Sequence, residues 1–507
     1  MDSLKDLINV VNKKAIKRVE VMGNSTNYSS KMRELYDGIA EGRFETDNDA
    51  AHALYDSDED NINYKKIKYR LEKRLINTAF FIDLNAPGYT DEDKANFSCY
   101  RNMLAAYILA RLGIRKTGAK IATKTLNHAI RFEFSNIAYR MCTYLRNYHG
   151  HVTGDLKKMD YYHEQSVHYL QLAFNENIAE GYFSKLAALS YRSDVDRNSL
   201  EEIAISYLDE IRTIIKDQQS LILLRYYHFI HSIRYLLVND YANLLIACNE
   251  AIQFFSTKSQ LFKSGEAFYL WKLLSCIHLK DYQEGEEAIE ATLSFVDKDS
   301  VNYFSALEYQ TLLYFHARRL QKVYEIIASA ANDKRLIREM PASIKEHWLL
   351  YEAYANLFVR MEKIDPERSP YKLKRFRLSK FLNEVPIFSM EKRRANIPVL
   401  IIQILFLLQQ KKYSQVVDRM DALNAYCYRY LRKDETFRSN VFIKMLLQIP
   451  KANFHREAVT RKTKNLRDRL DNVPLEVARQ SAEIEIIPYE DLWEYVLEML
   501  SMRFHYV

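Results

Sequence analysis

The hydrophobic positions of this chain recur with the spacing of α-helices along almost its whole length. Within residues 61–82, for example, Ile67, Leu71 and Leu75 lie four residues apart. Side chains at this spacing share one face of a helix, and polar residues cover the other. The pattern predicts an all-α chain with one short β-like run, IEII, at 484–487. A terminal helix follows this run.

Pairs of predicted helices repeat through the middle of the chain. In each pair the second helix begins with a large side chain directly after a turn, at Tyr241, Tyr282, Leu320 and Tyr413. Small residues follow ten positions later in three of these pairs, and Gly285 lies three positions after Tyr282. Small side chains allow neighbouring helices to approach closely. We therefore predict helical hairpins that pack on one another.

These hairpins resemble the tetratricopeptide-like helical-repeat superfamily over roughly residues 160–433. The resemblance implies a right-handed α-solenoid of antiparallel helix pairs, which would span 91–433. A small N-terminal helical module would occupy 1–90 and a C-terminal helical cap 434–507. The units exceed the standard length of about 34 residues, and the Trp-Leu-Gly pattern of the first helix is absent.

The two ends of the chain carry further helix signals. Thr46 is a predicted N-cap with Asp49 in the capping-box position. Near the C-terminus, Pro488 is expected in the first turn of the terminal helix. The apolar stripe predicted for this helix is Leu492, Trp493, Val496, Leu497 and Leu500. Its predicted polar face is Glu490, Asp491, Glu494 and Glu498.

Glycine and proline are scarce, with 11 and 9 residues, and no glycine follows Gly285. This scarcity excludes glycine-rich catalytic loops from the last part of the chain. The segment 113–121 lacks the Lys-Ser/Thr pair of a phosphate-binding loop, and 56–67 lacks the glycine and glutamate of a calcium loop. We interpret both segments as turns between helices.

The sequence contains no arrangement typical of an active site or a metal centre. The five cysteines are scattered singly, and His149, His151, His163 and His168 have no carboxylate at ligand spacing. We therefore expect no enzymatic activity, no metal and no cofactor.

We expect a non-enzymatic scaffold or adaptor that holds a protein or peptide partner on the concave face of the array. The first helices of the pairs would line that face, because they are rich in tyrosine with interspersed charges. The predicted contact residues are Arg225, Tyr226, His228, Tyr269, Lys272, Tyr303, Glu308 and Tyr309.

The net charge is +7, and its densest feature is a basic segment after residue 370. Interleaved aromatic residues make it a candidate contact for nucleic acid or an acidic partner. A solvated helix face is the alternative interpretation. The residues of this patch are Lys372, Lys374, Arg375, Arg377, Lys380, Arg393 and Arg394.

The N-terminal module suggests a second possible function. A short helix, an acidic turn and a basic helix resemble the bacterial regulators that join a helix-turn-helix to tetratricopeptide repeats. Lys65, Lys66 and Arg70 would contact the nucleic acid, with the repeats as a sensor. The acidic residues of 56–60 oppose this function, because they repel phosphates.

The longest apolar run, Ile397–Leu408, has 12 residues, whereas a bilayer requires about 20. The first twenty residues contain no uninterrupted apolar stretch followed by a small-residue cleavage site. We expect no membrane contact and a cytoplasmic location.

Overall fold

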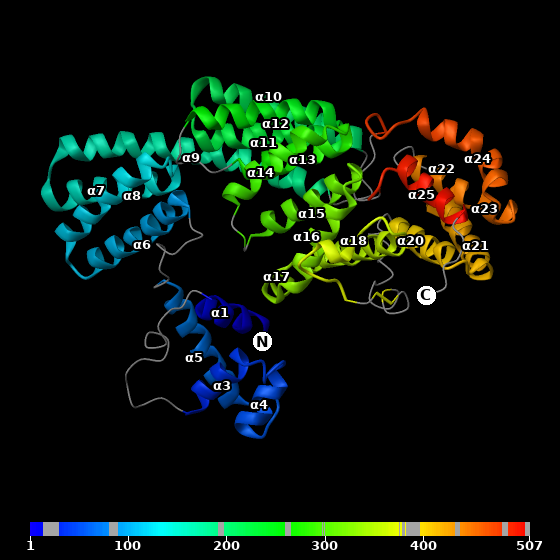
Figure 1. The fold of residues 1–507 in the computed structure, drawn as a ribbon. Helices are drawn as coiled ribbons and strands as arrows, with labels where there is room; N and C mark the ends of the chain where they lie inside the picture. Colours follow the sequence, from blue (N-terminus) through cyan, green and yellow to red (C-terminus); the bar gives the residue numbers. More distant parts are fainter. Residues whose placement is uncertain are drawn as a thin grey trace. The chain divides into compact units, whose positions relative to one another are not determined.

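The computed structural model describes residues 1–13, 30–80, 90–190, 197–258, 265–296, 298, 300–374, 376–377, 381, 396–430, 437–478 and 485–501. Within these residues every regular element is a helix and none is a strand, which confirms the all-α prediction (Figure 1). The chain divides into two compact units, Met1–Leu170 and Gln171–Val507.

The β-like run predicted before the terminal helix is wrong for its described residues. Residues 485–487 are irregular, and Ile486 and Ile487 are both buried. A half-buried strand would bury alternate side chains and would pair with a neighbouring strand. Here the two isoleucines instead join the core that surrounds the terminal helix.

In the described part of the first 80 residues, four helices enclose a core of their own. They are α1 (Asp2–Lys13), α3 (Ser30–Ala40), α4 (Asp47–Tyr55) and α5 (Ile62–Ala79). The predicted capping box is present, because Thr46 accepts a hydrogen bond from the Asp49 backbone and Asp49 accepts one from Thr46. Ile67, Leu71 and Leu75 are buried, as their spacing predicts.

The rest of the first unit begins with α6 (Asp91–Arg111), which packs against α7 (Arg115–Arg131). Next along the chain are α8 (Ser135–Tyr148) and a π-helical turn, η1 (His149–Thr153). The long helix α9 (Leu156–Ser190) then continues into the second unit. Gly118 lies inside α7, where a Cβ atom would collide with the hydroxyl of Tyr144. This glycine therefore serves helix packing and not phosphate binding.

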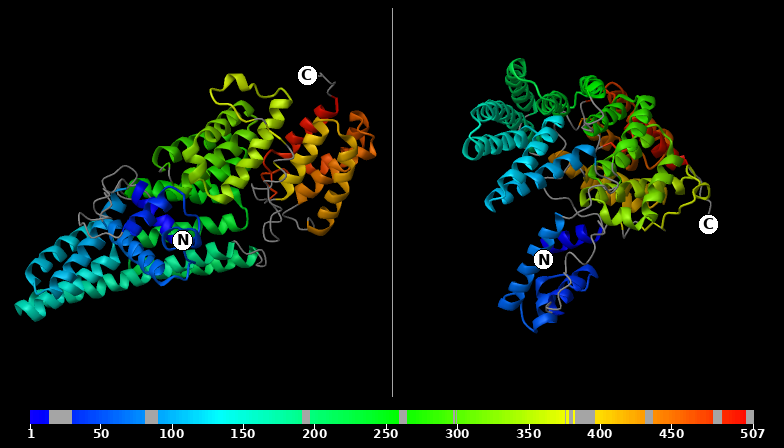
Figure 2. Two further views of the ribbon diagram at one scale, coloured as in Figure 1. Left: turned by 90° about the horizontal axis from the view of Figure 1, so that it is seen from below. Right: turned by 90° about the vertical axis from the view of Figure 1, so that its left-hand side faces the viewer.

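The second unit continues with helices most of which contact their successors along the chain, and neighbouring helices lie side by side in Figures 1 and 2. The first of them are α10 (Arg197–Asp217), α11 (Leu221–Leu237), α12 (Tyr241–Lys258), α13 (Glu266–Leu279), α14 (Tyr282–Phe295), α15 (Val301–His316) and α16 (Leu320–Asn332). Those that follow are α17 (Lys334–Glu339), α18 (Ala342–Arg360), the 3₁₀ turn η2 (Pro366–Arg368), α20 (Asn396–Gln409) and α21 (Tyr413–Tyr430). The C-terminal part contains α22 (Phe437–Leu446), α23 (Gln448–Lys451), α24 (Arg456–Asp471) and α25 (Tyr489–Ser501).

The four helices α12, α14, α16 and α21 begin at the residues predicted to open second helices. Gly285 faces Leu313 so closely that a Cβ atom would lie 2.8 Å from its Cδ1. The small residues predicted ten positions into these helices are buried, namely Ala251, Thr292 and Ala330. The hairpin prediction is thus confirmed for these helix starts and contacts.

The turns of these hairpins use left-handed residues that are not glycine. Asn239, Lys280, Arg318 and Lys411 have φ between 53° and 57°. In each turn the next amide donates to a carbonyl five residues earlier, as in Asp281 N to Cys276 O at 2.9 Å. This is the Schellman arrangement of a helix end, in which glycine is the usual left-handed residue. Asparagine, lysine and arginine in this role explain how the hairpins form with so little glycine.

One hairpin departs from the others. After α18, the described residues 361–374 and 376–377 contain only the 3₁₀ turn η2, and no second α-helix. α18 also contacts α20. The irregular stretch at 371–377 carries part of the predicted basic patch.

No helix in the described residues is long and apolar enough to span a bilayer.

Candidate functional site

A cavity of about 640 Å³ lies beside this irregular stretch, among the end of α18, residues 376–377, α20 and α21. Its volume is within the range of about 300–1,000 Å³ that is common for ligand sites. The lining residues are Arg360, Phe376, Arg377, Gln403, Leu407, Gln410, Lys412, Gln415, Asp418 and Arg419. We call this cavity the basic pocket.

Positive charge dominates the basic pocket. Its four cationic side chains are exposed, and Asp418 is the one carboxylate among the lining residues. Within the described part of the chain, Arg377, Lys412 and Arg419 form no ion pair. Cations gathered in a concave surface produce a focused positive potential. The pocket is therefore suited to an anionic group.

Arg360 is held by contacts with its aromatic neighbours. Its guanidinium lies 5.5 Å from the centre of the Phe406 ring, and Nη2 donates to the carbonyl of Phe376 at 3.4 Å. The ring of Phe376 stacks on that of Phe406 at 4.8 Å. Leu407 is buried beneath. An occupant would therefore meet an apolar floor as well as charge.

Three amide side chains, Gln403, Gln410 and Gln415, add donors and acceptors to the wall. The turn between α20 and α21 helps to position them, because Lys412 N donates to Leu407 O at 2.9 Å. This hydrogen bond fixes the backbone where Gln410 and Lys412 leave the turn. These wall residues carry no signal in the sequence, since they look like ordinary helix-surface residues.

The predicted basic patch is only partly described. Arg377 lines the basic pocket, Lys374 is exposed, and Lys372 forms an ion pair with Glu367 at 2.5 Å. The remaining residues, Arg375, Lys380, Arg393 and Arg394, lie outside the described residues. The backbone of the patch is anchored on α16, because Tyr324 Oη accepts from Leu373 N at 3.2 Å.

The residues predicted on the first helices lie on α11, α13 and α15. Glu308 is buried, where it accepts from His347 Nδ1 at 2.6 Å and from the Tyr351 hydroxyl at 3.0 Å. Lys272 forms an ion pair with Glu284 at 2.7 Å. These interactions within the chain already engage both charges.

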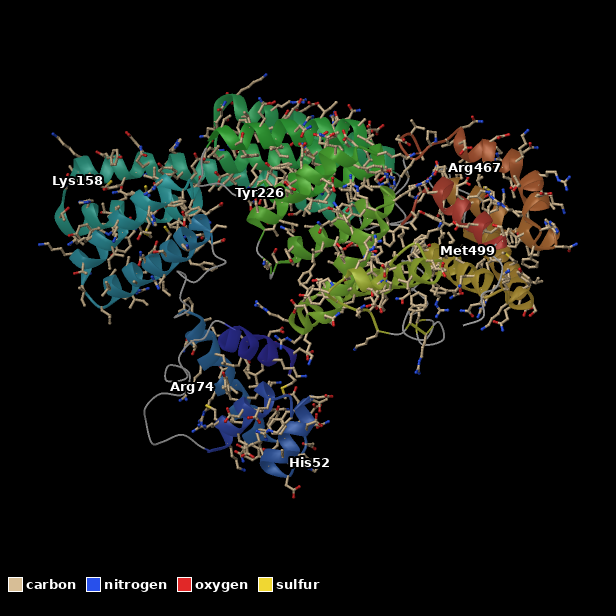
Figure 3. The ribbon with its side chains drawn as sticks, in the orientation of Figure 1. His52, Arg74, Lys158, Tyr226, Arg467 and Met499 are labelled. Carbon is tan, nitrogen blue, oxygen red and sulfur yellow. The ribbon has the colours of Figure 1, made fainter. Side chains whose placement is uncertain are left out.

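The other first-helix residues are partly accessible. Tyr226, labelled in Figure 3, packs its ring against Phe183 and Phe229. His228 packs against Phe254 and Phe255, and burial lowers the pKa of this imidazole to about 4. Arg225, Tyr269, Tyr303 and Tyr309 are half-buried.

In the N-terminal module, the basic residues predicted to contact nucleic acid lie on the exposed face of α5. Lys65 forms an ion pair with Asp60 at 2.7 Å, which also raises the pKa of the lysine. Lys66 and Arg70 are exposed, as is Lys73 one turn further along the helix. Two of the three predicted contacts thus remain available to a ligand.

A buried ionic cluster joins α22 to α25. Arg438 is fully buried and donates to Glu485 at 2.6 and 3.1 Å, to Glu490 at 2.6 Å and to Val473 O at 2.7 Å. Glu490 was predicted on the polar face, and this prediction is wrong because the arginine draws it inward. Nearby, Arg467, labelled in Figure 3, links α24 to α25 through Glu494.

The described residues offer little reaction chemistry. Four cysteines are buried, and burial raises the pKa of the Cys99 thiol to about 11. A protonated buried thiol is a poor nucleophile. No group of His, Cys, Asp and Glu among these residues is arranged to hold a metal ion.

No family model matches the chain, and neither a curated protein nor a solved structure matches it. The basic pocket, which combines volume, charge and an apolar floor, is the candidate functional site.

Proposed function

We propose that the chain is a non-enzymatic binding protein whose basic pocket receives an acidic segment of a partner protein. The observation that carries this proposal is the lining of the pocket, with four cationic side chains and one carboxylate around a floor of Phe376 and Leu407. Carboxylates of the partner would pair with the arginines and the lysine. An apolar side chain between them would contact the floor.

The order of helix contacts supports a helical-repeat architecture for this binding protein. Each helix from α10 to α16 contacts the next, and the first helices α13, α15 and α18 also contact one another in succession. Such contacts are typical of tetratricopeptide-like repeats in a right-handed α-solenoid. In this arrangement Tyr226, Tyr269 and Tyr303 extend the partner surface along the first helices.

Calorimetric titration with a synthetic peptide that alternates glutamate and leucine tests the proposal. The double variant Lys412→Glu/Arg419→Glu is expected to bind at least tenfold more weakly than the unchanged chain, a loss of about 1.4 kcal/mol. A peptide with lysine in place of glutamate should not bind. The proposal fails if the double variant retains full affinity.

A matched control uses two exposed cations elsewhere. Arg461→Glu/Lys464→Glu changes the net charge by the same amount on α24. Its affinity should stay within twofold of the unchanged chain. An equal loss in the two variants would instead indicate unspecific attraction by the net positive charge.

The N-terminal module supports a second candidate function, a regulator with a nucleic-acid-binding head. Lys66, Arg70 and Lys73 lie together on the exposed face of α5, beside exposed Tyr69. A gel shift with duplex DNA at low salt tests this function, and Lys66→Glu/Arg70→Glu should abolish the shift. Absence of any shift for the unchanged chain at low salt would exclude it.

A further inference from the structure

A second surface of the molecule is an apolar face on α6. The buried residues Ala95, Cys99 and Ala106 face α7 and α8. At the edge of the exposed face, the Tyr100 hydroxyl accepts from Asn136 at 3.1 Å and the Tyr107 ring packs edge-on against Tyr144. The exposed face carries large hydrophobic side chains with 39–69% of their surface accessible, namely Tyr100, Leu104, Tyr107, Ile108 and Leu112.

The spacing makes this face continuous. Tyr100, Leu104, Ile108 and Leu112 follow one another at four-residue intervals, and Tyr107 lies beside them. Residues at this spacing form one strip along a helix. The 21 residues of α6 extend over about 31 Å, and the strip from Tyr100 to the C-cap residue Leu112 runs along about 18 Å of its C-terminal part.

Scattered hydrophobic residues are normal on protein surfaces, but a contiguous strip marks an interaction site. The helix that ends a stack normally presents a polar outer face. In α25, for comparison, the buried stripe Leu492, Val496 and Leu497 is accompanied by exposed Glu494. The outer face of α6 carries large apolar side chains instead, as interaction surfaces do.

The charges along α6 identify the partner. The first turn is acidic, with Asp91, Glu92 and Asp93, and the other end is basic, with Arg111 followed by Arg115 and Lys116. A second α6 in antiparallel orientation places the acidic end of each helix beside the basic end of the other. We propose that this chain forms a two-fold symmetric dimer through antiparallel pairing of α6.

The register follows from the apolar strip. We place Leu104 on the two-fold axis. A residue that lies n positions before Leu104 in one copy then faces the residue n positions after Leu104 in the other copy. Arg101 then faces Tyr107 of the second copy, where a cation–π contact forms. Tyr100 faces Ile108, and Asp93 lies about one helical turn from Arg111 of the second copy.

Parallel pairing is disfavoured, because each residue would then face its own copy. Arg101 would oppose Arg101 and Arg111 would oppose Arg111, and like charges in close contact repel. An unrelated acidic or apolar helix would lack the matched ends. The charge pattern thus favours a second copy of this chain in the antiparallel orientation.

Disulfide trapping in the full chain tests this proposal. In a background in which Cys427 is changed to serine, the described cysteines are all buried, so an added surface cysteine dominates the oxidation. Leu104→Cys should yield a covalent dimer under mild oxidation, because the two thiols meet at the axis. Leu112→Cys should stay monomeric, because in this register it faces residue 96.

Sedimentation equilibrium supplies a second readout that needs no cysteine. Leu104→Glu should weaken self-association at least tenfold, and Ile205→Glu, at another exposed hydrophobic residue on α10, should leave it unchanged. Crosslinking of both cysteine variants would contradict the antiparallel register. A monomeric unchanged chain without trapping of Leu104→Cys would overturn the dimer, and would indicate that a different protein covers α6.

Discussion

Single buried polar residues decide how the C-terminal helices hold together. Arg438 of α22 is enclosed by Glu485, Glu490 and the carbonyl of Val473. Its hydrogen bonds to these groups connect α22 to α25 and to the segment between the two helices. A buried charge is tolerated only when its partners are present. The cluster should therefore respond strongly to removal of one partner and weakly to removal of the charge pair.

Replacement of Arg438 by methionine tests this dependence. The variant leaves Glu485 buried without its cation, so we expect the free energy of unfolding to fall by about 3–5 kcal/mol. The double variant Arg438→Met/Glu485→Gln removes the arginine and its fully buried carboxylate and leaves only the partly exposed Glu490. It should recover at least about 1 kcal/mol of the loss. Urea unfolding at pH 7 measures both changes, and a double variant no more stable than the single one would contradict this account.

Buried histidines determine how the free energy of unfolding changes as the pH falls. Burial lowers the pKa of His228 and of His316 to about 4, whereas an imidazole in the unfolded chain has a pKa of about 6.5. The unfolded state therefore binds more protons between these values. The stability from neutral burial is complete above about pH 6.5 and is lost as pH falls towards 4.

The variant His228→Leu measures the contribution of one of these histidines. Each such histidine contributes about 1.4 kcal/mol per pH unit to the slope of stability within this window. The variant should show a slope smaller by about that amount between pH 6 and pH 5, whatever its stability at pH 7. Urea midpoints at both pH values give the slope, and an unchanged slope would mean that His228 is protonated in the folded state.

At the scale of elements, the hairpin turns place residues other than glycine in the left-handed conformation where glycine is usual. Glu362 has φ of 58° in the turn after α18, and Lys363 N donates to Phe358 O at 2.9 Å. A left-handed residue with a Cβ atom costs about 1 kcal/mol. Glutamate is thus poorly suited to this exposed position.

Glu362→Gly should raise the free energy of unfolding by about 0.5–1 kcal/mol, because glycine adopts this backbone conformation without strain. Glu362→Ala is the control, since it removes the side chain and keeps the Cβ atom. The alanine variant should show no gain. Thermal unfolding of the two variants side by side measures the difference, and an equal gain in both would assign the effect to the lost carboxylate.

Much of the fold was accessible from the sequence, because helix periodicity and turn-opening residues are local signals. The starts at Tyr241, Tyr282, Leu320 and Tyr413 and the capping box at Thr46 were predicted in this way. The pairing of Arg438 with Glu485 and Glu490 was not, because it depends on tertiary contacts between segments far apart in the sequence.

The candidate site was foreseen only in part for the same reason. Arg377 belonged to a visible run of charge, but Arg360, Gln403 and Arg419 meet it only because α18, α20 and α21 pack together. Helix-surface arginines and glutamines carry no local mark of function. Conversely, Glu308 and Lys272 looked like surface residues that a partner could contact. In the structure Glu308 accepts a hydrogen bond from His347, and Lys272 forms an ion pair with Glu284.

At the scale of the whole molecule, the chain contains separate surfaces with different chemistry. The unit Met1–Leu170 contains the basic face of α5 and the apolar face of α6, and the unit Gln171–Val507 contains the basic pocket. The positive charge of the basic pocket suits it to an acidic segment. The exposed apolar side chains of α6 suit this helix to self-association. A dimer would present two pockets, so a partner with two acidic segments would bind with enhanced avidity.

Carbodiimide crosslinking of an isotope-labelled glutamate–leucine peptide tests the central claim most directly, because this reagent joins a carboxylate to a lysine amine only when the two are in contact. Mass spectrometry of the digested product should locate the main link at Lys412, with little at Lys462 or Lys464 of α24. Links spread evenly over these lysines, or absent from Lys412, would contradict the assignment of the basic pocket.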